Sequence, residues 1–156
     1  MNTLERVRVN NIPYIKKEDR ARYEQYIQKV VAEVQVGIDI ELEGIVDFAK
    51  SITTAGDANY VISSIVWRLF DAKPSYTYGN QLISILEDVQ VCLAHKNAWT
   101  DQFNEPLYIF LKALCYGIRY NVKAVRGMLA CVVLEFYRRR LADYEDGAIK
   151  RNGDIL

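Results

Sequence analysis

Residues 122–142 read VKAVRGMLACVVLEFYRRRLA, and this stretch decides the fold class. Its apolar side chains recur at steps of three and four residues, at Val125, Met128, Leu129, Val132 and Phe136. This spacing places them on one face of an α-helix, and such a face is stable when it is buried against other apolar surfaces. The stretch therefore predicts a long last helix over about residues 122–142, in an all-α helical bundle.

The rest of the chain shows the same periodicity, which predicts five or six helices in total. Helices are expected over residues 17–34, from Leu42 to Ile52, from an N-cap at Asp57 to before Pro74, from a cap at Ser75 or Thr77 to Leu93, and from Pro106 to Ile118. Residues 36–39 alternate apolar side chains with others, as a loop or a short strand would. At most one short strand pair is expected.

A chain of 156 residues is long enough for one hydrophobic core and too short for two. A single helical domain over residues 1–156 is expected, with an extended N-terminal segment at 1–15 and a C-terminal tail at 147–156. The apolar positions of residues 82–93 and 125–136 match at a constant offset. This match indicates either a duplicated helical hairpin or two amphipathic helices that agree by chance.

The charge balance indicates which classes of partner the protein can bind, and the cysteines indicate whether it forms disulfides or a zinc site. Basic and acidic residues number 20 each, so no basic excess favours duplex nucleic acid or an anionic membrane surface. Cys92, Cys115 and Cys131 form no Cys-x-x-Cys pair and lie in apolar helical patterns, so we expect core thiols rather than disulfides or a zinc site. No apolar run approaches the length of a membrane span, and the sequence predicts a soluble cytoplasmic protein.

The usual catalytic motifs are missing from the sequence. A single histidine, His95, argues against a Ser/His/Asp triad and a histidine-rich metal site, and no glycine-rich phosphate loop is present. Helical Mg²⁺-dependent nucleotide hydrolases need two pairs of acids one helical turn apart. The acidic clusters at 41–43, 87–88 and 143–146 do not supply them. We expect a protein that is not an enzyme and has no catalytic residue, metal or cofactor, with such a hydrolase as the least favoured alternative.

A first cluster of basic and aromatic side chains lies near the N-terminus and consists of Tyr14, Lys16, Lys17 and Arg20. Two interpretations are open for it. It is either the solvated first turn of a helix, where Glu18 and Asp19 balance the charge, or one part of a binding site. The local sequence favours the solvated turn.

A second cluster follows the last apolar position of the long helix and consists of Tyr137, Arg138, Arg139, Arg140 and Tyr144. The three arginines span nearly a full helical turn, so at most two of them can face one partner. Two convergent guanidinium groups beside a tyrosine could clamp a phosphate and stack a base. The alternative is that the arginines pair with the acids at 143–146 of the same helix.

Four motifs stand out when the chain is read as a whole: PYIKKEDR at 13–20, G-x-x-NYVI at 56–62, LEFYRR at 134–139 and YED-x-x-I-x-x-NGD at 144–154. In combination they resemble a family of small uncharacterised proteins common in bacteriophages and mobile elements. The resemblance implies a phage or prophage origin and no particular biochemical activity. Because the motifs are polar and aromatic, we expect them to meet around one pocket, to which the second motif adds Asn59 and Tyr60.

These observations favour a non-enzymatic, phage-type binding protein that sequesters a small anionic nucleotide signal and so counters a host defence. The expected ligand-binding residues are Tyr14, Lys16, Lys17, Arg20, Asn59, Tyr60, Tyr137, Arg138, Arg139 and Tyr144. The alternative is a protein–protein interaction or scaffold module that acts on a host or phage protein. With 51% apolar residues, the chain is also expected to form a homo-oligomer.

Overall fold

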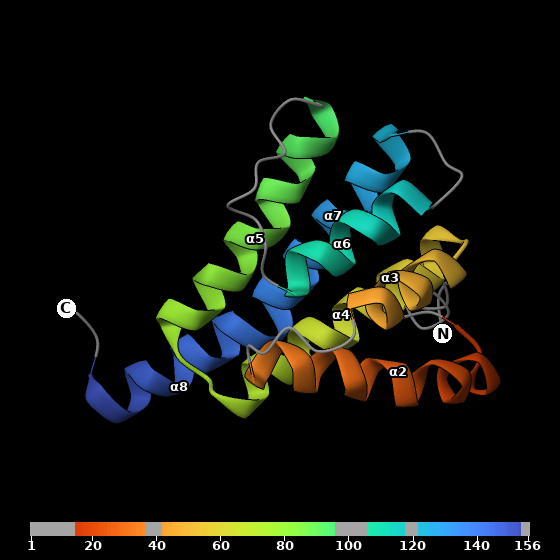
Figure 1. The fold of residues 1–156 in the computed structure, drawn as a ribbon. Coiled ribbons are helices and arrows are strands. Elements are labelled where there is room, and N and C mark those ends of the chain that lie inside the picture. Colours follow the sequence, from red (N-terminus) through yellow and green to blue (C-terminus); the bar gives the residue numbers. More distant parts are fainter. Residues whose placement is uncertain (1–14, 37–41, 96–105, 118–121, 154–156) are drawn as a thin grey trace, which may run out of the picture.

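The computed structural model describes residues 15–36, 42–95, 106–117 and 122–153, and all elements in these ranges are helical (Figure 1). They are α2 (Lys17–Val36), α3 (Leu42–Ser51), α4 (Ala55–Ala72), α5 (Tyr76–Ala94), α6 (Pro106–Gly117), α7 (Val122–Phe136), a π-helical turn η2 (Tyr137–Leu141) and α8 (Ala142–Asn152). Because α7, η2 and α8 follow without a break, the described residues form six continuous helices. The all-α prediction is confirmed, while the alternating residues expected as a loop or short strand lie mostly outside the described ranges.

Two short polar side chains set where the central helices begin. Thr54 Oγ1 accepts a hydrogen bond from the Asp57 N–H (3.1 Å), and Ser75 Oγ accepts one from the Tyr78 N–H (3.0 Å). Each bond satisfies an N–H that the first helical turn leaves unpaired. Of the two caps predicted for the next helix, Ser75 or Thr77, the structure shows Ser75. The cap predicted at Asp57 is wrong, because Thr54 caps α4 and Asp57 is an acid inside the first turn.

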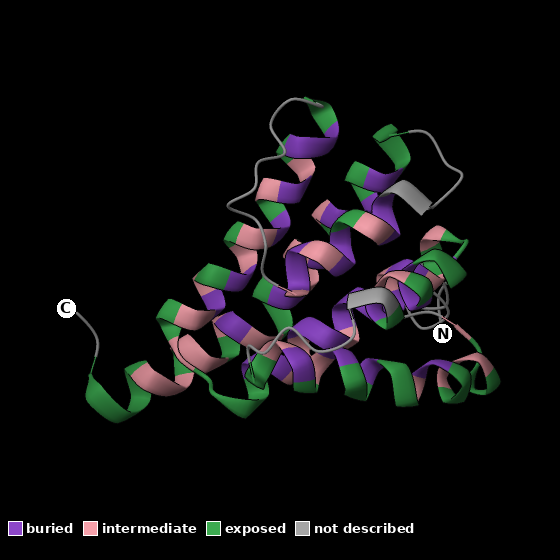
Figure 2. Ribbon diagram, viewed as in Figure 1, coloured by how far each residue is buried: buried purple, intermediate pink, exposed green. Residues whose placement is uncertain are grey.

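Helix α4 lies at the centre of the fold, and most of its surface is buried (Figure 2). α2 and α7 pack against it, α5 packs mainly against α7, and α3 packs mainly against α6 (Figure 1). A duplicated hairpin would pair α4 with α5 and α6 with α7. The most extensive helix contacts are not between these successive helices. A duplication of the hairpin stays a prediction.

One turn of the last helix, η2, contains one residue more than a regular α-helical turn. The Ala142 N–H bonds to the Tyr137 carbonyl, five residues back, as in a π-helix. In a regular α-helix the next core position after Phe136 would fall at Arg139 or Arg140. The wide turn moves this position to Leu141, which is fully buried, and leaves the arginines at the edge of the core.

The last helix is also longer than the sequence predicts. It continues past residue 142 as α8 to Asn152, through most of the stretch expected as a tail at 147–156. It ends at Gly153, whose φ of 85° suits a residue without a Cβ and whose N–H bonds to the Ile149 carbonyl (2.7 Å). α8 has no buried residue, and apolar periodicity reveals only helices with a buried face.

The three cysteines differ in their surroundings. Cys92 and Cys115 are buried, as predicted, and burial raises the pKa of both thiols, that of Cys115 to about 12. Cys131 is exposed, so the prediction of a core thiol is wrong for this residue. It follows the buried Leu129 by two positions, and helix geometry turns such a residue about 200° away from the buried face.

Candidate functional site

One side of α4 carries polar and aromatic side chains in place of core residues. We call it the polar side of α4, and it consists of Tyr60, Ser64, Trp67, Arg68 and Asp71. Steps of three and four residues keep these side chains on the same side of the helix. All except Tyr60 are at least partly exposed, whereas the residues of α4 between them are buried. Side chains from α2 and from η2 reach this side, so it gathers groups from three elements.

Trp67 meets two arginines of the π turn. The guanidinium carbon of Arg140 lies 4.8 Å from the centroid of the Trp67 ring, and that of Arg139 lies 5.8 Å from it. These distances are within the range of cation–π contacts. Together with Asp71, these residues form what we call the Trp67 contact, in which two positive charges share one aromatic surface.

Two N–H groups in the Trp67 contact have no hydrogen-bond acceptor among the described residues. They are the Nε1–H of Trp67 and the Nε–H of Arg140, and both nitrogen atoms are buried. A buried donor without an acceptor costs roughly 1–3 kcal/mol, and native proteins rarely leave such groups unpaired. An acceptor that enters the contact, such as a water molecule or an oxygen of an anionic ligand, would remove this cost.

The carboxylates next to the π turn are already paired. Glu135 Oε2 lies 2.8 Å from Arg138 Nη2 and 3.3 Å from Arg139 Nε. Asp71 Oδ2 lies 3.6 Å from Arg140 Nη1. Three guanidinium groups thus share two carboxylates, which leaves surplus positive charge at the Trp67 contact.

These ion pairs differ from the ones that the sequence suggests. The acids at 143–146 are the alternative partners expected for the arginines, but the pairs observed are with Glu135 and Asp71. Long helical side chains lean toward the N-terminus of their helix, which favours Glu135 over acids that follow. Asp71 comes from α4, at a distance in sequence that no local pattern reveals.

At the other end of the polar side of α4, residues of α2 make two contacts. The Arg20 guanidinium carbon lies 5.5 Å from the centroid of the Tyr60 ring. One turn along α2, Glu24 forms a bidentate pair with Arg68, with both N···O distances at 2.6 Å. The hydrogen bonds from Arg68 lower the pKa of Glu24, so the ion pair is maintained at neutral pH.

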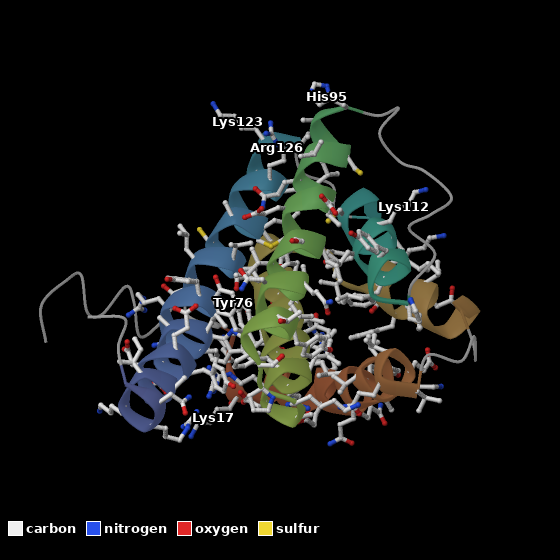
Figure 3. All side chains as sticks on the ribbon, turned by 90° about the vertical axis from the view of Figure 1, so that its left-hand side faces the viewer. Lys17, Tyr76, His95, Lys112, Lys123 and Arg126 are labelled. Atoms are coloured by element: carbon white, nitrogen blue, oxygen red, sulfur yellow. The ribbon has the colours of Figure 1, made fainter. Side chains whose placement is uncertain are left out.

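The structure brings together only some of the site residues predicted in the N-terminal half. Arg20 and Tyr60 are in contact. Asn59 Oδ1 accepts a hydrogen bond from Ser63 Oγ (3.1 Å) within α4. Lys16 and Lys17 are exposed at the start of α2, where Lys17 is labelled in Figure 3. The predicted residue Tyr14 lies outside the described residues.

The predicted site residues near the C-terminus also have separate environments. Arg139 belongs to the Trp67 contact, whereas Arg138 donates a hydrogen bond to Glu135 of its own helix. Tyr137 has 47% of its surface exposed. Tyr144 packs edge-on against Phe70, with 5.8 Å between the ring centroids. Of these residues, only Arg139 faces the polar side of α4 in a described contact.

The predicted residues that contact the polar side of α4 therefore do so in two places, Arg20 at Tyr60 and Arg139 at Trp67, instead of meeting in one pocket. Seven residues of helix separate the two rings by about 10 Å along the axis. Sequence reasoning missed Trp67 and Asp71, and it placed Arg140 in the second cluster but not among the expected ligand-binding residues. Two signals were available for them: Trp67 follows Tyr60 by seven residues, and the core positions Phe136 and Leu141 are separated by a step of five.

A second group of basic side chains gathers at one end of the molecule. His95 lies at the end of α5, and Lys123 and Arg126 lie at the start of α7 (Figure 3). All three are exposed and form no ion pair with another described residue. Because the Trp67 contact adds buried donors to its positive charge, it is the stronger candidate for a binding site.

Comparison with protein families matches residues 12–99 and 104–155 to the domain of unknown function DUF6899. The chain belongs to this family. Both elements of the Trp67 contact, α4 and η2, lie within the matched residues of the DUF6899 domain. No curated protein and no solved structure matches the chain.

Two further properties concern the described parts of this DUF6899 chain. None of the helices there is both long and apolar enough to cross a membrane. The same residues contain no group of three or more His, Cys, Asp or Glu side chains that could hold a metal ion. What the Trp67 contact offers is N–H donors and cations.

Proposed function

We propose that this protein is a non-enzymatic binding protein that captures a small anionic ligand at the Trp67 contact. The observation that carries the proposal is the pair of buried donors, the Nε1–H of Trp67 and the Nε–H of Arg140, which have no acceptor among the described residues. Anionic oxygens would accept these bonds and balance the surplus positive charge.

A nucleotide is the ligand class that we favour. Its phosphate suits neighbouring guanidinium groups, which bind phosphate oxygens in a planar, bidentate way. Its base has a π-face that stacks on aromatic or guanidinium planes, and the exposed ring of Tyr137 lies next to the arginines in sequence. The resemblance to phage proteins extends the proposal to a nucleotide signal of a host defence system, which the protein would sequester in the cytoplasm.

The chemistry of the site supports binding without turnover. Apart from Asp71, its polar groups are N–H donors, which can hold an anion but do not remove a proton from water or substrate. The two nearby carboxylates, Asp71 and Glu135, already pair with guanidinium groups. A general base must be free to accept a proton within hydrogen-bond reach of the reacting atom.

A thermal-shift titration with inorganic pyrophosphate tests the anion site. Wild type is expected to gain stability with rising pyrophosphate, by about 2.7 kcal/mol at 100 times the dissociation constant. Arg140→Ala should weaken binding by at least about 1.5 kcal/mol, because it removes charge-assisted hydrogen bonds. Arg138→Ala is the matched control and should respond as wild type, since Arg138 pairs with Glu135 on its own helix.

An unchanged melting temperature of wild type in pyrophosphate would contradict the proposal, and so would equal shifts in all three proteins. The identity of the ligand is a separate measurement. Mass spectrometry of the material released when the purified protein is denatured is expected to detect a copurifying nucleotide.

A second candidate function, a protein-binding or scaffold module, rests on a different observation. The outer side of α7 carries apolar or small residues at Gly127, Cys131 and Leu134, and Leu134 has 68% of its surface exposed. Exposed apolar surface of this kind is used in protein interfaces. A homodimer would be the simplest assembly.

Sedimentation separates the two candidates. If the protein is a protein-binding module, it should be a dimer at tens of micromolar protein, and Leu134→Asp should dissociate this dimer. Pyrophosphate should then have no effect on the stability of the protein. A wild-type monomer that responds to pyrophosphate would favour the small-ligand function. Leu134→Asp should leave the fold intact, because its side chain is mostly in solvent.

A further inference from the structure

A pocket lies between α2 and α3. It has a volume of about 470 Å³, and its walls include Arg22, Tyr23 and Tyr26 of α2 and Asp47 and Phe48 of α3. This volume is in the range of small-molecule pockets. None of these residues belongs to the Trp67 contact, so the pocket is a separate site.

Three aromatic rings form its apolar wall. The rings of Tyr26 and Phe48 stack with centroids 4.9 Å apart and planes 20° apart, and the Tyr23 ring is tilted against Phe48 at 6.1 Å. Tyr26 has 43% of its surface exposed, which leaves aromatic surface open to a ligand. The face of an aromatic ring carries negative charge density, so such a wall attracts cations.

The positive charge in the wall is already balanced. Arg22 Nη2 donates a hydrogen bond to Tyr23 Oη, and this hydroxyl in turn donates to Asp57 Oδ2, both at 2.7 Å. Arg22 Nη2 also lies 3.5 Å from Asp57 Oδ2, and its guanidinium carbon lies 4.6 Å from the Tyr23 ring centroid. The guanidinium group of Arg22 is thus held by Asp57, which is not part of the pocket wall, and by Tyr23, which is.

The negative charge in the wall is not balanced. Asp47 is exposed at the pocket and forms no ion pair with any residue in the described ranges. With Arg22 paired to Asp57, the carboxylate of Asp47 is the remaining charge. An aromatic wall next to a free carboxylate is the arrangement that recognises organic cations.

We infer that this pocket binds a small organic cation that carries an ammonium group on an apolar or aromatic body. Asp47 balances the ammonium charge, the exposed part of the Tyr26 ring attracts the cation, and the aromatic wall covers the apolar body. The ligand chemistry is opposite to that of the Trp67 contact. The inference therefore stands independently of the proposed function.

Three probes with the same ring test this inference: phenethylammonium, 2-phenylethanol and phenylacetate. They are titrated into the full-length protein and followed by ¹H–¹⁵N correlation spectra. Phenethylammonium is expected to bind most tightly, the neutral alcohol more weakly and the anion most weakly. The largest shifts are expected for amides of α2 and α3 around the pocket.

Two variants test whether phenethylammonium binds in this pocket. Asp47→Asn should weaken phenethylammonium binding about three- to fivefold, the upper part of the range expected for an exposed ion pair, and leave 2-phenylethanol binding unchanged. Asp143→Asn, an exposed acid on α8, is the matched control and should bind as wild type. Absence of binding by phenethylammonium at millimolar concentration, equal binding of phenylacetate, or an unchanged affinity in Asp47→Asn would each overturn the inference.

Discussion

Tyr23 shows how one side chain joins two helices of this fold. Its hydroxyl donates a hydrogen bond to Asp57 of α4 and accepts one from Arg22 of α2. Burial, with a further contribution from the Asp57 carboxylate, raises the pKa of Tyr23 to about 12. The neutral phenol is the form that the fold requires, because a buried phenolate would lose solvation and repel the carboxylate.

Stability should therefore fall at alkaline pH, and Tyr23→Phe should reduce this fall. The unfolded chain releases the Tyr23 proton near a pKa of about 10, whereas the folded protein holds it to about 12. The stabilisation is complete below pH 10 and is lost as pH rises to 12. Urea denaturation at pH 8, 10 and 11 measures it. Equal alkaline losses in wild type and Tyr23→Phe would contradict the assignment, since the buried Cys115 thiol titrates in both proteins.

Gly79 and Gly127 are expected to respond oppositely to the same substitution. A Cβ at Gly79 would lie 2.6 Å from Leu141 Cδ1 and 3.3 Å from Phe70 Cε2, whereas a Cβ at Gly127 would meet nothing within 4 Å. Gly79→Ala should lower the free energy of unfolding by roughly 1 kcal/mol, because overpacking costs about 1–3 kcal/mol and helix propensity returns about 1. Gly127→Ala should raise it by roughly 0.5–1 kcal/mol. Urea denaturation gives both values, and changes of the same sign would contradict the packing described for the π turn.

At the scale of elements, apolar periodicity predicts the helices that bury one face. α5 and α7 are recognisable because residues such as Leu82, Leu86 and Val89, or Leu129 and Val132, follow helical steps. The same reasoning cannot find α8, which buries no residue. It also misplaces the start of α4, because a threonine and an aspartate three positions apart are both good N-cap residues.

The π turn is the element that sequence periodicity least reveals, and it is also the one that creates the candidate site. By moving the core position from Arg139 or Arg140 to Leu141, it keeps the arginines out of the core and beside Trp67. π turns are often found at functional sites. The arginine cluster could be identified from the sequence, but which two arginines converge depends on this extra residue.

Deletion of Arg138 tests whether the π turn serves the site. The deletion removes the extra residue, so Leu141 becomes the fourth residue after Phe136 and stays on the core face of a regular helix. The exposed pair of Arg138 with Glu135 contributes little to stability. We expect cooperative unfolding and an unchanged helical circular dichroism spectrum, together with loss of the pyrophosphate response. An unfolded variant would show that the turn is required for folding, and wild-type binding would show that the site does not need it.

At the scale of the whole molecule, α4 serves both the core and the candidate site. Its buried sides hold the helices around it, and its polar side receives Arg20 and Glu24 from α2 and two arginines from η2. The sequence identified the arginine and tyrosine clusters at the two ends of the chain. It did not identify Trp67 as their neighbour, because contacts between helices far apart in the chain leave no local pattern.

The most direct test of the anion site uses Trp67 as its own reporter. The chain has two tryptophans, so Trp99→Phe leaves Trp67 as the only indole, and pyrophosphate does not absorb in its fluorescence range. In this background we expect pyrophosphate to cause a saturable change in Trp67 fluorescence. Arg140→Ala should abolish this change, and Arg138→Ala should retain it. No change at millimolar pyrophosphate, or an equal change in the Arg140→Ala protein, would contradict the assignment of Trp67 and Arg140 as an anion-binding pair.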